Sequence, residues 1–271
     1  MSIGGREGRG QFKPAKRSLG QNFLTDANIA RKIVDSLDIR PGDNVLEIGP
    51  GRGALTRHIL ERQPGRFMVL EKDDDLGSSL TATYPSIELV PGDALAFPWQ
   101  TLDPEAGWKI VGNLPYNIAS PLIWDIVSQA KCASAVFMVQ LEVGQRLRAP
   151  SGGKDYGALS VWVQSHARVE LLFKVPPQVF HPQPKVTSAV MRFILLPQQP
   201  DPMAVKALAA TLRMCFQQRR KQLATILKSK GIVGGEDILL GLGIQPSQRP
   251  ETLEPERFQA LANRLRNQFV S

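Results

Sequence analysis

Two short segments have residue types suited to transferring a small group to a flat, amine-bearing ring. Segment 113–116 reads Asn-Leu-Pro-Tyr and offers a side-chain amide, a stiff turn and an aromatic ring. Segment 47–53 reads Glu-Ile-Gly-Pro-Gly-Arg-Gly and forms a glycine-rich turn after an apolar run. Glycine lets the backbone approach a ligand closely because it has no Cβ. We therefore predict a nucleoside-bearing cofactor at the turn and methyl transfer to the exocyclic amine of a base beside it.

Two acidic residues extend the predicted cofactor site. Glu71 ends a predicted strand, where its carboxylate can accept both hydroxyls of a ribose. Asp93 ends the next strand, where a short side chain can accept a hydrogen bond from an adenine amine. The dinucleotide fingerprint has the spacing G-x-G-x-x-G, whereas here the third glycine comes one residue early. A glycine turn alone can serve packing only, but two acids at successive strand ends favour a cofactor.

The Asn-Leu-Pro-Tyr segment fits an amine that is a weak nucleophile. The lone pair of adenine N6 is delocalised into the ring, and two acceptors at that nitrogen would localise and aim it. We assign these acceptors to the Asn113 side-chain oxygen and the Leu114 carbonyl, while Pro115 stiffens the turn. Tyr116 offers a ring face to the extruded base, and such stacking contributes about 1–3 kcal/mol per base. Orientation and electrostatics then account for the rate.

Apolar runs alternate with helical patterns over most of the chain, which predicts an α/β fold with a parallel sheet covered on both faces. Helical patterns include residues 54–62, a segment starting near Ser120-Pro121, and one capped by Thr25 or Asp26. The predicted strands cover residues 44–48, 66–70, 87–90, 109–113, 135–140, 169–175 and 189–195.

The C-terminal part has a different pattern. Residues 197–202 read Pro-Gln-Gln-Pro-Asp-Pro, which is typical of a linker. Beyond it, residues 203–227 and 254–269 show helical patterns and no strand signal. We expect three parts: a flexible basic arm over residues 1–17, a domain of alternating strands and helices over 18–198, and a helical domain over 199–271. A transit peptide is the weaker interpretation of the arm, because the segment is not amphipathic.

Composition narrows the class of protein. The chain has 271 residues, of which 42% are hydrophobic, yet no apolar run is long enough to span a bilayer. Its two cysteines and three histidines lack ligand spacing, so we expect no metal site, and a reducing cytoplasm fits. The formal net charge of +8 favours a polyanionic partner, although it is also compatible with an ordinary basic surface.

The glycine turn with its two acids resembles class I S-adenosylmethionine-dependent methyltransferases. More closely, the whole chain is similar to the ribosomal RNA small subunit (16S) adenine N6,N6-dimethyltransferase family of the KsgA/RsmA type. Besides the segments above, the resemblance rests on Leu-Gly-Gln-Asn-Phe-Leu, Phe-His-Pro-Gln-Pro-Lys-Val-Thr-Ser, Gln-Arg-Arg-Lys and Arg-Pro-Glu-Thr-Leu at residues 19–24, 180–188, 218–221 and 249–253.

This resemblance implies a Rossmann-like, seven-stranded sheet with the last strand antiparallel, plus a small all-helical domain. It implies dimethylation of two adjacent adenosines near the 3′ end of 16S rRNA in the immature small subunit. Nothing in the sequence indicates an obligate dimer, so we expect a monomer. Phe180 would stack on the adenine opposite Tyr116; its alternative is a core aromatic at a loop edge. The implied cofactor-binding residues are Gln21, Asn22, Leu24, Gly49, Gly51, Glu71, Lys72, Asp93, Ala94 and Asn113.

Cations in the helical part form a candidate RNA-binding stripe. Apolar positions of this segment can pack inward and leave the cations outside. A solvated helix face is the usual meaning of such charge, but the resemblance and the lack of matching acids in the segment favour phosphate contact. The predicted RNA-binding residues are Arg213, Arg219, Arg220, Lys221 and Lys228.

Three other functions compete with this interpretation. A related methyltransferase acting on large-subunit rRNA is disfavoured by the Arg-Arg-Lys and Arg-Pro-Glu-Thr-Leu segments. A ribosome-assembly factor that binds without catalysis is disfavoured by the intact segment 113–116. A nicotinamide-dependent oxidoreductase fits the fold class, but neither the glycine spacing nor the Asn-Leu-Pro-Tyr turn.

Overall fold

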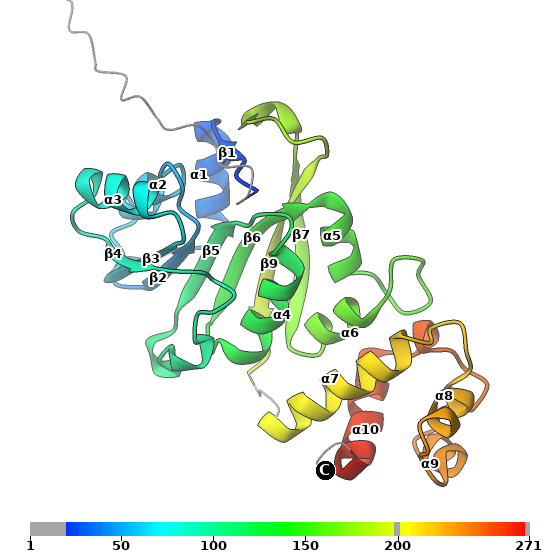
Figure 1. Ribbon diagram of the computed structural model, residues 1–271. Coiled ribbons are helices and arrows are strands. Elements are labelled where there is room, and N and C mark those ends of the chain that lie inside the picture. Colours follow the sequence, from blue (N-terminus) through cyan, green and yellow to red (C-terminus); the bar gives the residue numbers. More distant parts are fainter. Residues whose placement is uncertain (1–19, 198–200, 269–271) are drawn as a thin grey trace, which may run out of the picture.

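A seven-stranded sheet forms the centre of the protein (Figure 1). The computed structural model describes residues 20–197 and 201–268. The strand order is β4-β3-β2-β5-β6-β9-β7, and β9 alone among these seven runs in the direction opposite to the other six. This confirms the predicted sheet. The strands are β2 (Asn44–Ile48), β3 (Arg66–Glu71), β4 (Glu88–Pro91), β5 (Lys109–Asn113), β6 (Ser134–Gln140), β7 (Ala167–Val175) and β9 (Ser188–Leu195).

Helices cover both faces of the sheet (Figure 1). Successive side chains of a strand point to opposite faces, so Val45 and Leu46 of β2 belong to two different hydrophobic clusters. The cluster around Val45 includes side chains of α1 (Ala27–Asp35), α2 (Thr56–Leu60) and α3 (Asp74–Thr83). The cluster around Leu46 includes side chains of α4 (Ala119–Gln129), α5 (Leu141–Leu147) and α6 (Ala158–Gln164).

The first two helices begin differently from one another. Asp26 caps α1, because its side chain accepts hydrogen bonds from the amides of Asn28 and Ile29 at 2.8 and 3.0 Å. Of the two predicted caps, Asp26 is therefore correct, and Thr25 instead donates to the Val179 carbonyl. The helix predicted over residues 54–62 is shorter, since turns after the glycine segment continue up to the start of α2.

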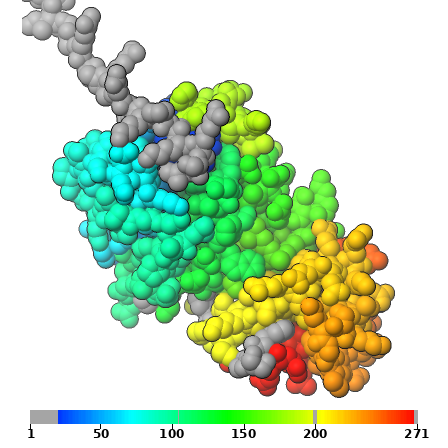
Figure 2. Space-filling model, in the orientation of Figure 1, coloured from blue at the N-terminus to red at the C-terminus, as the bar shows by residue number. Residues whose placement is uncertain are grey.

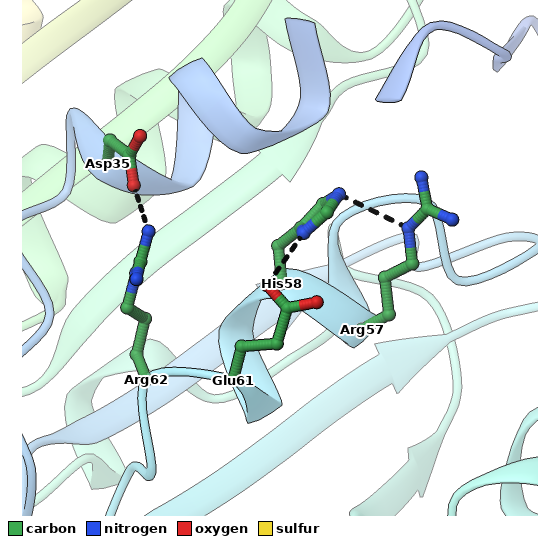
Figure 3. Close-up of polar contacts among 5 residues, drawn as sticks. All are labelled: Asp35, Arg57, His58, Glu61 and Arg62. Carbon is green, nitrogen blue, oxygen red and sulfur yellow. Dashed lines mark hydrogen bonds and ion pairs between the residues drawn. The ribbon is translucent and has the colours of Figure 1, made fainter. Parts of the chain in front are cut away.

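Polar contacts join α1 and α2 behind the glycine turn (Figure 3). Arg62, just after α2, pairs with Asp35 at the end of α1. His58 is buried; its Nδ1 lies 3.0 Å from Glu61 and its Nε2 accepts a hydrogen bond from Arg57 at 3.2 Å. An acceptor role for Nε2 places the proton of a neutral ring on Nδ1. These contacts fix the helix that follows the glycine turn.

The described residues after 200 form only helices and turns. The segment predicted as helical over 203–227 is interrupted by a turn at residues 217–222. The Leu223 amide donates to the Gln248 carbonyl at 2.8 Å, so a tertiary contact separates two helices there. The predicted arm, part of the linker and Phe269 lie outside the described residues. The helices are α7 (Pro202–Phe216), α8 (Leu223–Ser229), α9 (Gly235–Gly241) and α10 (Pro255–Leu265).

Hydrogen bonds from the loop over residues 151–157 link the sheet-containing part of the protein to these C-terminal helices. The sheet-containing part and the C-terminal helices are in contact in Figure 2. The Gly152 amide donates to the Glu251 carbonyl at 2.7 Å. The Tyr156 hydroxyl, fully buried, donates to the Leu253 carbonyl at 2.8 Å. The glycine-rich loop therefore contacts the segment that reads Arg-Pro-Glu-Thr-Leu.

Candidate active site

A cavity lies at the carboxyl ends of β2, β3 and β5, the edge where open α/β sheets bind ligands. The N-terminal segment, residues 20–24, forms one of its walls. Every residue predicted from sequence to bind cofactor lines this cavity, and so do three predicted catalytic residues, Leu114, Pro115 and Tyr116. Residues from five separated parts of the sequence therefore meet at one place.

Two glycines of the turn need their conformations. Gly49 has φ +62°, and a Cβ there would enter open space within the lining of the cavity. Gly51 has φ +56°, and a Cβ there would approach the Phe23 ring to 3.1 Å. Both backbone conformations favour glycine over residues with a side chain. The lack of a Cβ at Gly49 leaves the cavity open, and the lack of a Cβ at Gly51 leaves room for the N-terminal segment to lie against the turn.

Two backbone amides hold the Glu71 carboxylate at the end of β3. Gly51 N donates to Oε2 at 3.1 Å, and Asp73 N donates to Oε1 at 2.9 Å. Each oxygen has a second lone pair, so both can also accept a ribose hydroxyl. Burial raises the pKa of Glu71, and the backbone hydrogen bonds oppose that shift.

Asp93, beyond the end of β4, is held in a similar way. Lys72 Nζ lies 2.7 Å from its Oδ2, and Leu95 N donates to its Oδ1 at 3.0 Å. The hydrogen bond from Lys72 is the main cause that lowers the pKa of Asp93, followed by the Leu95 amide. Asp93 is therefore ionised at neutral pH and can accept a hydrogen bond from an amine.

Glu47, on β2 just before the turn, is a buried carboxyl in the cavity lining. Thr56 Oγ1 donates to its Oε2 at 2.7 Å. Burial raises the pKa of Glu47 to about 8, and the nearby charge of Glu71 also raises it. Most of this carboxyl is therefore protonated at neutral pH.

Contacts on both sides hold the N-terminal segment over the cavity. Its strand β1 (Phe23–Leu24) pairs antiparallel with β8 (Phe180–His181), so Leu24 lies opposite Phe180. Gln21 Nε2 donates to Asp73 Oδ2 at 3.3 Å on the other side. The segment therefore spans from the helix after β3 to the loop that precedes β9.

Asn113, the last residue of β5, links this segment to segment 113–116. Its Nδ2 donates to the Asn22 carbonyl at 2.9 Å. Because that bond uses the amide nitrogen, Oδ1 is the atom of the side chain suited to accept a hydrogen bond from a base amine. The sequence predicted this acceptor role for the Asn113 oxygen.

The two aromatic residues predicted to hold the base occupy different environments. Tyr116 is half-buried in the cavity wall, and its hydroxyl lies 2.8 Å from Ser188 Oγ. Phe180 is 4% exposed, belongs to the hydrophobic cluster around Val45, and is not part of the cavity lining. The structure therefore brings Tyr116 to the cavity and places Phe180 in the core, opposite Leu24 in the β1–β8 pair.

None of the predicted RNA-binding cations is in the cavity lining: Arg213 lies on α7, Lys228 lies on α8, and the other three lie in the turn between these helices. Arg213, Arg220, Lys221 and Lys228 are exposed. Arg219 Nε lies 3.5 Å from Glu251 Oε2, so an acid from outside the segment partly compensates its charge.

The described residues contain no group of three or more side chains able to hold a metal ion. Within the same part of the chain, none of the helices has both the length and the apolar character that crossing a membrane requires.

Comparison with known proteins identifies the family. The model of the family described as ribosomal RNA adenine dimethylase matches residues 12–267. This chain belongs to the ribosomal RNA adenine dimethylase family. It is 52% identical to the ribosomal RNA small subunit methyltransferase A of Maridesulfovibrio salexigens, over 95% of this chain and 98% of that protein. It is 54% identical to the protein of the same name from Nitratidesulfovibrio vulgaris, over 91% and 95% of the two chains.

Solved structures agree with this family membership. A dimethyladenosine transferase from Plasmodium falciparum has a TM-score of 0.78 and 25% identity, covering 90% of this chain and 98% of that chain. The 23S rRNA methyltransferase ErmE has a TM-score of 0.66 and 28% identity, covering 90% and 99%. Both the fold and the activity predicted from sequence, an rRNA adenine dimethyltransferase, are therefore confirmed.

Sequence reasoning missed several residues in and around the cavity of this dimethylase. Phe23 and Arg52 both line it, and the Arg52 guanidinium lies 4.2 Å from the centre of the Phe23 ring. Phe23 stands between the predicted Asn22 and Leu24, so its position gave a usable signal. Ser188 gave no such signal, because its contact with Tyr116 joins residues far apart in the sequence.

Proposed function

We propose that this chain transfers methyl groups from S-adenosylmethionine to N6 of two adjacent adenosines near the 3′ end of 16S rRNA, in the immature small ribosomal subunit. One observation carries the proposal: the Asn113 amide is oriented by the Asn22 carbonyl in the wall of the same cavity that the Glu71 and Asp93 carboxylates line. The relatives named for small-subunit methylation cover nearly the whole chain and support the choice of RNA.

The cavity suits S-adenosylmethionine in both shape and charge. Gly49 faces open space, so the backbone there can lie against the methionine part of the cofactor. Glu71 would accept the ribose hydroxyls, and Asp93, kept ionised by Lys72, would accept the adenine amine. The N-terminal residues Gln21, Asn22 and Leu24 would cover the ligand.

The chain's own residues would position the target amine. The Asn113 oxygen and the Leu114 carbonyl would accept hydrogen bonds from its two N–H groups and aim the nitrogen lone pair at the methyl carbon. The Tyr116 ring would stack on the flipped base. When bound, the cofactor supplies a methyl group on a sulfonium, whose leaving group is a neutral thioether. For that reason the site needs no strong general base.

Large-subunit rRNA is the alternative substrate. The solved structure of a 23S rRNA methyltransferase resembles this chain at 28% identity. The relatives named for the small subunit are 52% and 54% identical, which favours the small subunit.

RNA would also contact the helical part, with residues 199–271 as an RNA-binding domain and residues 18–198 as the catalytic domain. The exposed cations Arg213, Arg220, Lys221 and Lys228 would neutralise phosphates, and Arg219 would do so after leaving Glu251. Such contacts position RNA without reading its sequence. We expect the protein to act as a monomer in the cytoplasm.

The decisive experiment uses labelled S-adenosylmethionine and small subunits that lack the modification. After reaction, the RNA is digested to nucleosides and the modified positions are mapped. We expect N6,N6-dimethyladenosine at two neighbouring small-subunit adenosines, and little label on mature small subunits, whose sites are already filled. Label appearing on large-subunit rRNA instead would support the alternative. Binding to the particle without label transfer would contradict both enzymatic assignments.

A further inference from the structure

One side-chain contact of the cavity wall has no role in the function described so far. The hydroxyls of Tyr116 and Ser188 share a hydrogen bond of 2.8 Å. Tyr116 lines the cavity immediately after the Asn-Leu-Pro turn. Ser188 is 0% exposed, so water does not compete for this hydrogen bond.

Ser188 is a rigid partner because strands hold it on both sides. It is the first residue of β9 and lies opposite Gln140 of β6 and Val175 of β7. The preceding carbonyl, that of Thr187, accepts a hydrogen bond from Leu141 N at 3.0 Å. A residue fixed in the interior of the sheet keeps its hydroxyl at a constant position.

The hydrogen bond therefore constrains the ring of Tyr116 at its far end. The near end is fixed by the turn, since the Ile118 and Ala119 amides both donate to the Pro115 carbonyl at 3.1 Å. With both ends held, the axis of the ring cannot swing about χ1, although the ring can still turn about that axis. Burial also raises the pKa of Tyr116, so the phenol keeps its proton near neutral pH.

We propose that Ser188 is a positioning residue for methyl transfer, which it serves by holding the axis of the Tyr116 ring at the place where the target base stacks. The proposal rests on the proposed function, because it assumes a base beside Tyr116. Ser188 touches neither cofactor nor base in this role. Ser188 also ends the segment that starts at Phe180. One short stretch of chain therefore carries Phe180 at its start and, at its end, the serine that holds Tyr116.

The first test compares Ser188→Ala with the unchanged protein in the labelled methyl-transfer assay. We expect kcat to fall roughly 10- to 100-fold, because small errors in orientation are costly in catalysis. The KM for the small subunit should change less than threefold, since phosphate contacts elsewhere dominate RNA affinity. The dissociation constant of the cofactor should not change. A kcat within twofold of that of the unchanged protein would overturn the proposal.

A double-mutant cycle separates positioning from general damage to the fold. Tyr116→Phe removes the same hydrogen bond from the other side and leaves the ring in place. If the bond is the only role of Ser188, the double variant is no slower than the slower single variant. Losses that multiply would assign Ser188 a separate, structural role. If Ser188→Ala fails to fold, full turnover by Tyr116→Phe still overturns the proposal.

Ser165→Ala is the matched control. Ser165 is also buried, and among the described residues its hydroxyl has no hydrogen-bond partner. We expect unchanged kcat and KM for this variant. The activity of the unchanged protein separates failure of the proposed function from failure of the positioning role. If the unchanged protein transfers no methyl group, the proposed function fails. If it is active and Ser188→Ala is equally active, only the positioning role is refuted.

Discussion

The two ends of the cavity are held by different kinds of contact. At the cofactor end, backbone amides donate to the carboxylates of Glu71 and Asp93, and the Lys72 side chain also donates to Asp93. At the base end, Tyr116 is held by its turn and by one side-chain hydrogen bond, and Phe180 is buried opposite Leu24. Backbone donors depend little on neighbouring side chains, whereas a side-chain contact is lost by one substitution. We infer from this difference that the proposed cofactor end is preformed, and that the proposed base end is completed when RNA binds.

The largest effect is expected at Asn113, which belongs to both ends. Asn113→Ala removes the acceptor for the amine and the contact with the Asn22 carbonyl. We expect kcat for methyl transfer to fall by about 10³-fold or more, while the fold persists. Circular dichroism and single-turnover assays check both points. Asn263→Ala, an exposed site on α10, is the control. Normal turnover by folded Asn113→Ala would refute the assignment.

Glu71→Ala tests the cofactor end alone. Loss of hydrogen bonds to a buried carboxylate should weaken cofactor binding about 100-fold, because hydrogen bonds to charged groups contribute roughly 1.5–3 kcal/mol each. Calorimetric titration measures the dissociation constant, and binding to the small subunit should be unaffected. Glu88→Ala removes an acid on β4 that pairs with Arg66 outside the cavity, and it should bind cofactor normally. Equal losses in the two variants would argue against a cofactor role for Glu71.

Glu47→Gln tests how the cofactor end depends on pH. The pKa of Glu47 is about 8 in the folded protein, against 4.5 for a free carboxyl. Between these values the folded state holds a proton that the unfolded state releases, so stability falls as pH rises from 4.5 to 8. The glutamine variant lacks this loss, and at pH 8 it should be more stable by up to a few kcal/mol. The check is thermal unfolding of both proteins without cofactor, measured from pH 5 to 8. If the pKa of Glu47 were that of a free carboxyl, the stabilities of the two proteins would change in parallel over this range.

Phe180→Leu tests the base end and should have the smallest effect. If the ring reaches the base when RNA binds, we expect kcat to fall about tenfold, with unchanged cofactor affinity. Phe193→Leu shortens another buried ring, in the opposite hydrophobic cluster. It should lower stability similarly and leave kcat unchanged. Full activity of Phe180→Leu would leave Phe180 a core residue only.

The parts of the fold that the sequence predicted are those with local signals. The bounds of β2 and β5 match the prediction to the residue, because each is a buried apolar run that ends at a turn. The break between α7 and α8 was missed, since Gln, Arg and Lys fill residues 217–222 and all favour helices. The contact that separates these helices, from Leu223 to the Gln248 carbonyl, is a tertiary one.

The candidate site shows the same division. Glu71 and Asp93 were predictable because the carboxyl ends of parallel strands meet at one edge of a sheet. The pairing of β1 with β8 joins two-residue strands about 150 positions apart, and no local pattern reveals it. That pairing places Phe180 opposite Leu24, which is why the sequence could not predict how deeply its ring is buried.

The contact between the loop at Gly152 and the C-terminal helices also has a consequence for substrate choice. Both hydrogen bonds are accepted by backbone carbonyls, those of Glu251 and Leu253. The backbone therefore fixes the distance between the predicted RNA-binding cations and Asn113. Two RNA-contacting regions held at a constant separation would select substrates by the distance between the two bound parts. Under the proposed function, the protein would therefore select an RNA in which the flipped adenosine lies at this distance from the phosphates that the cations contact, whatever the base sequence between them.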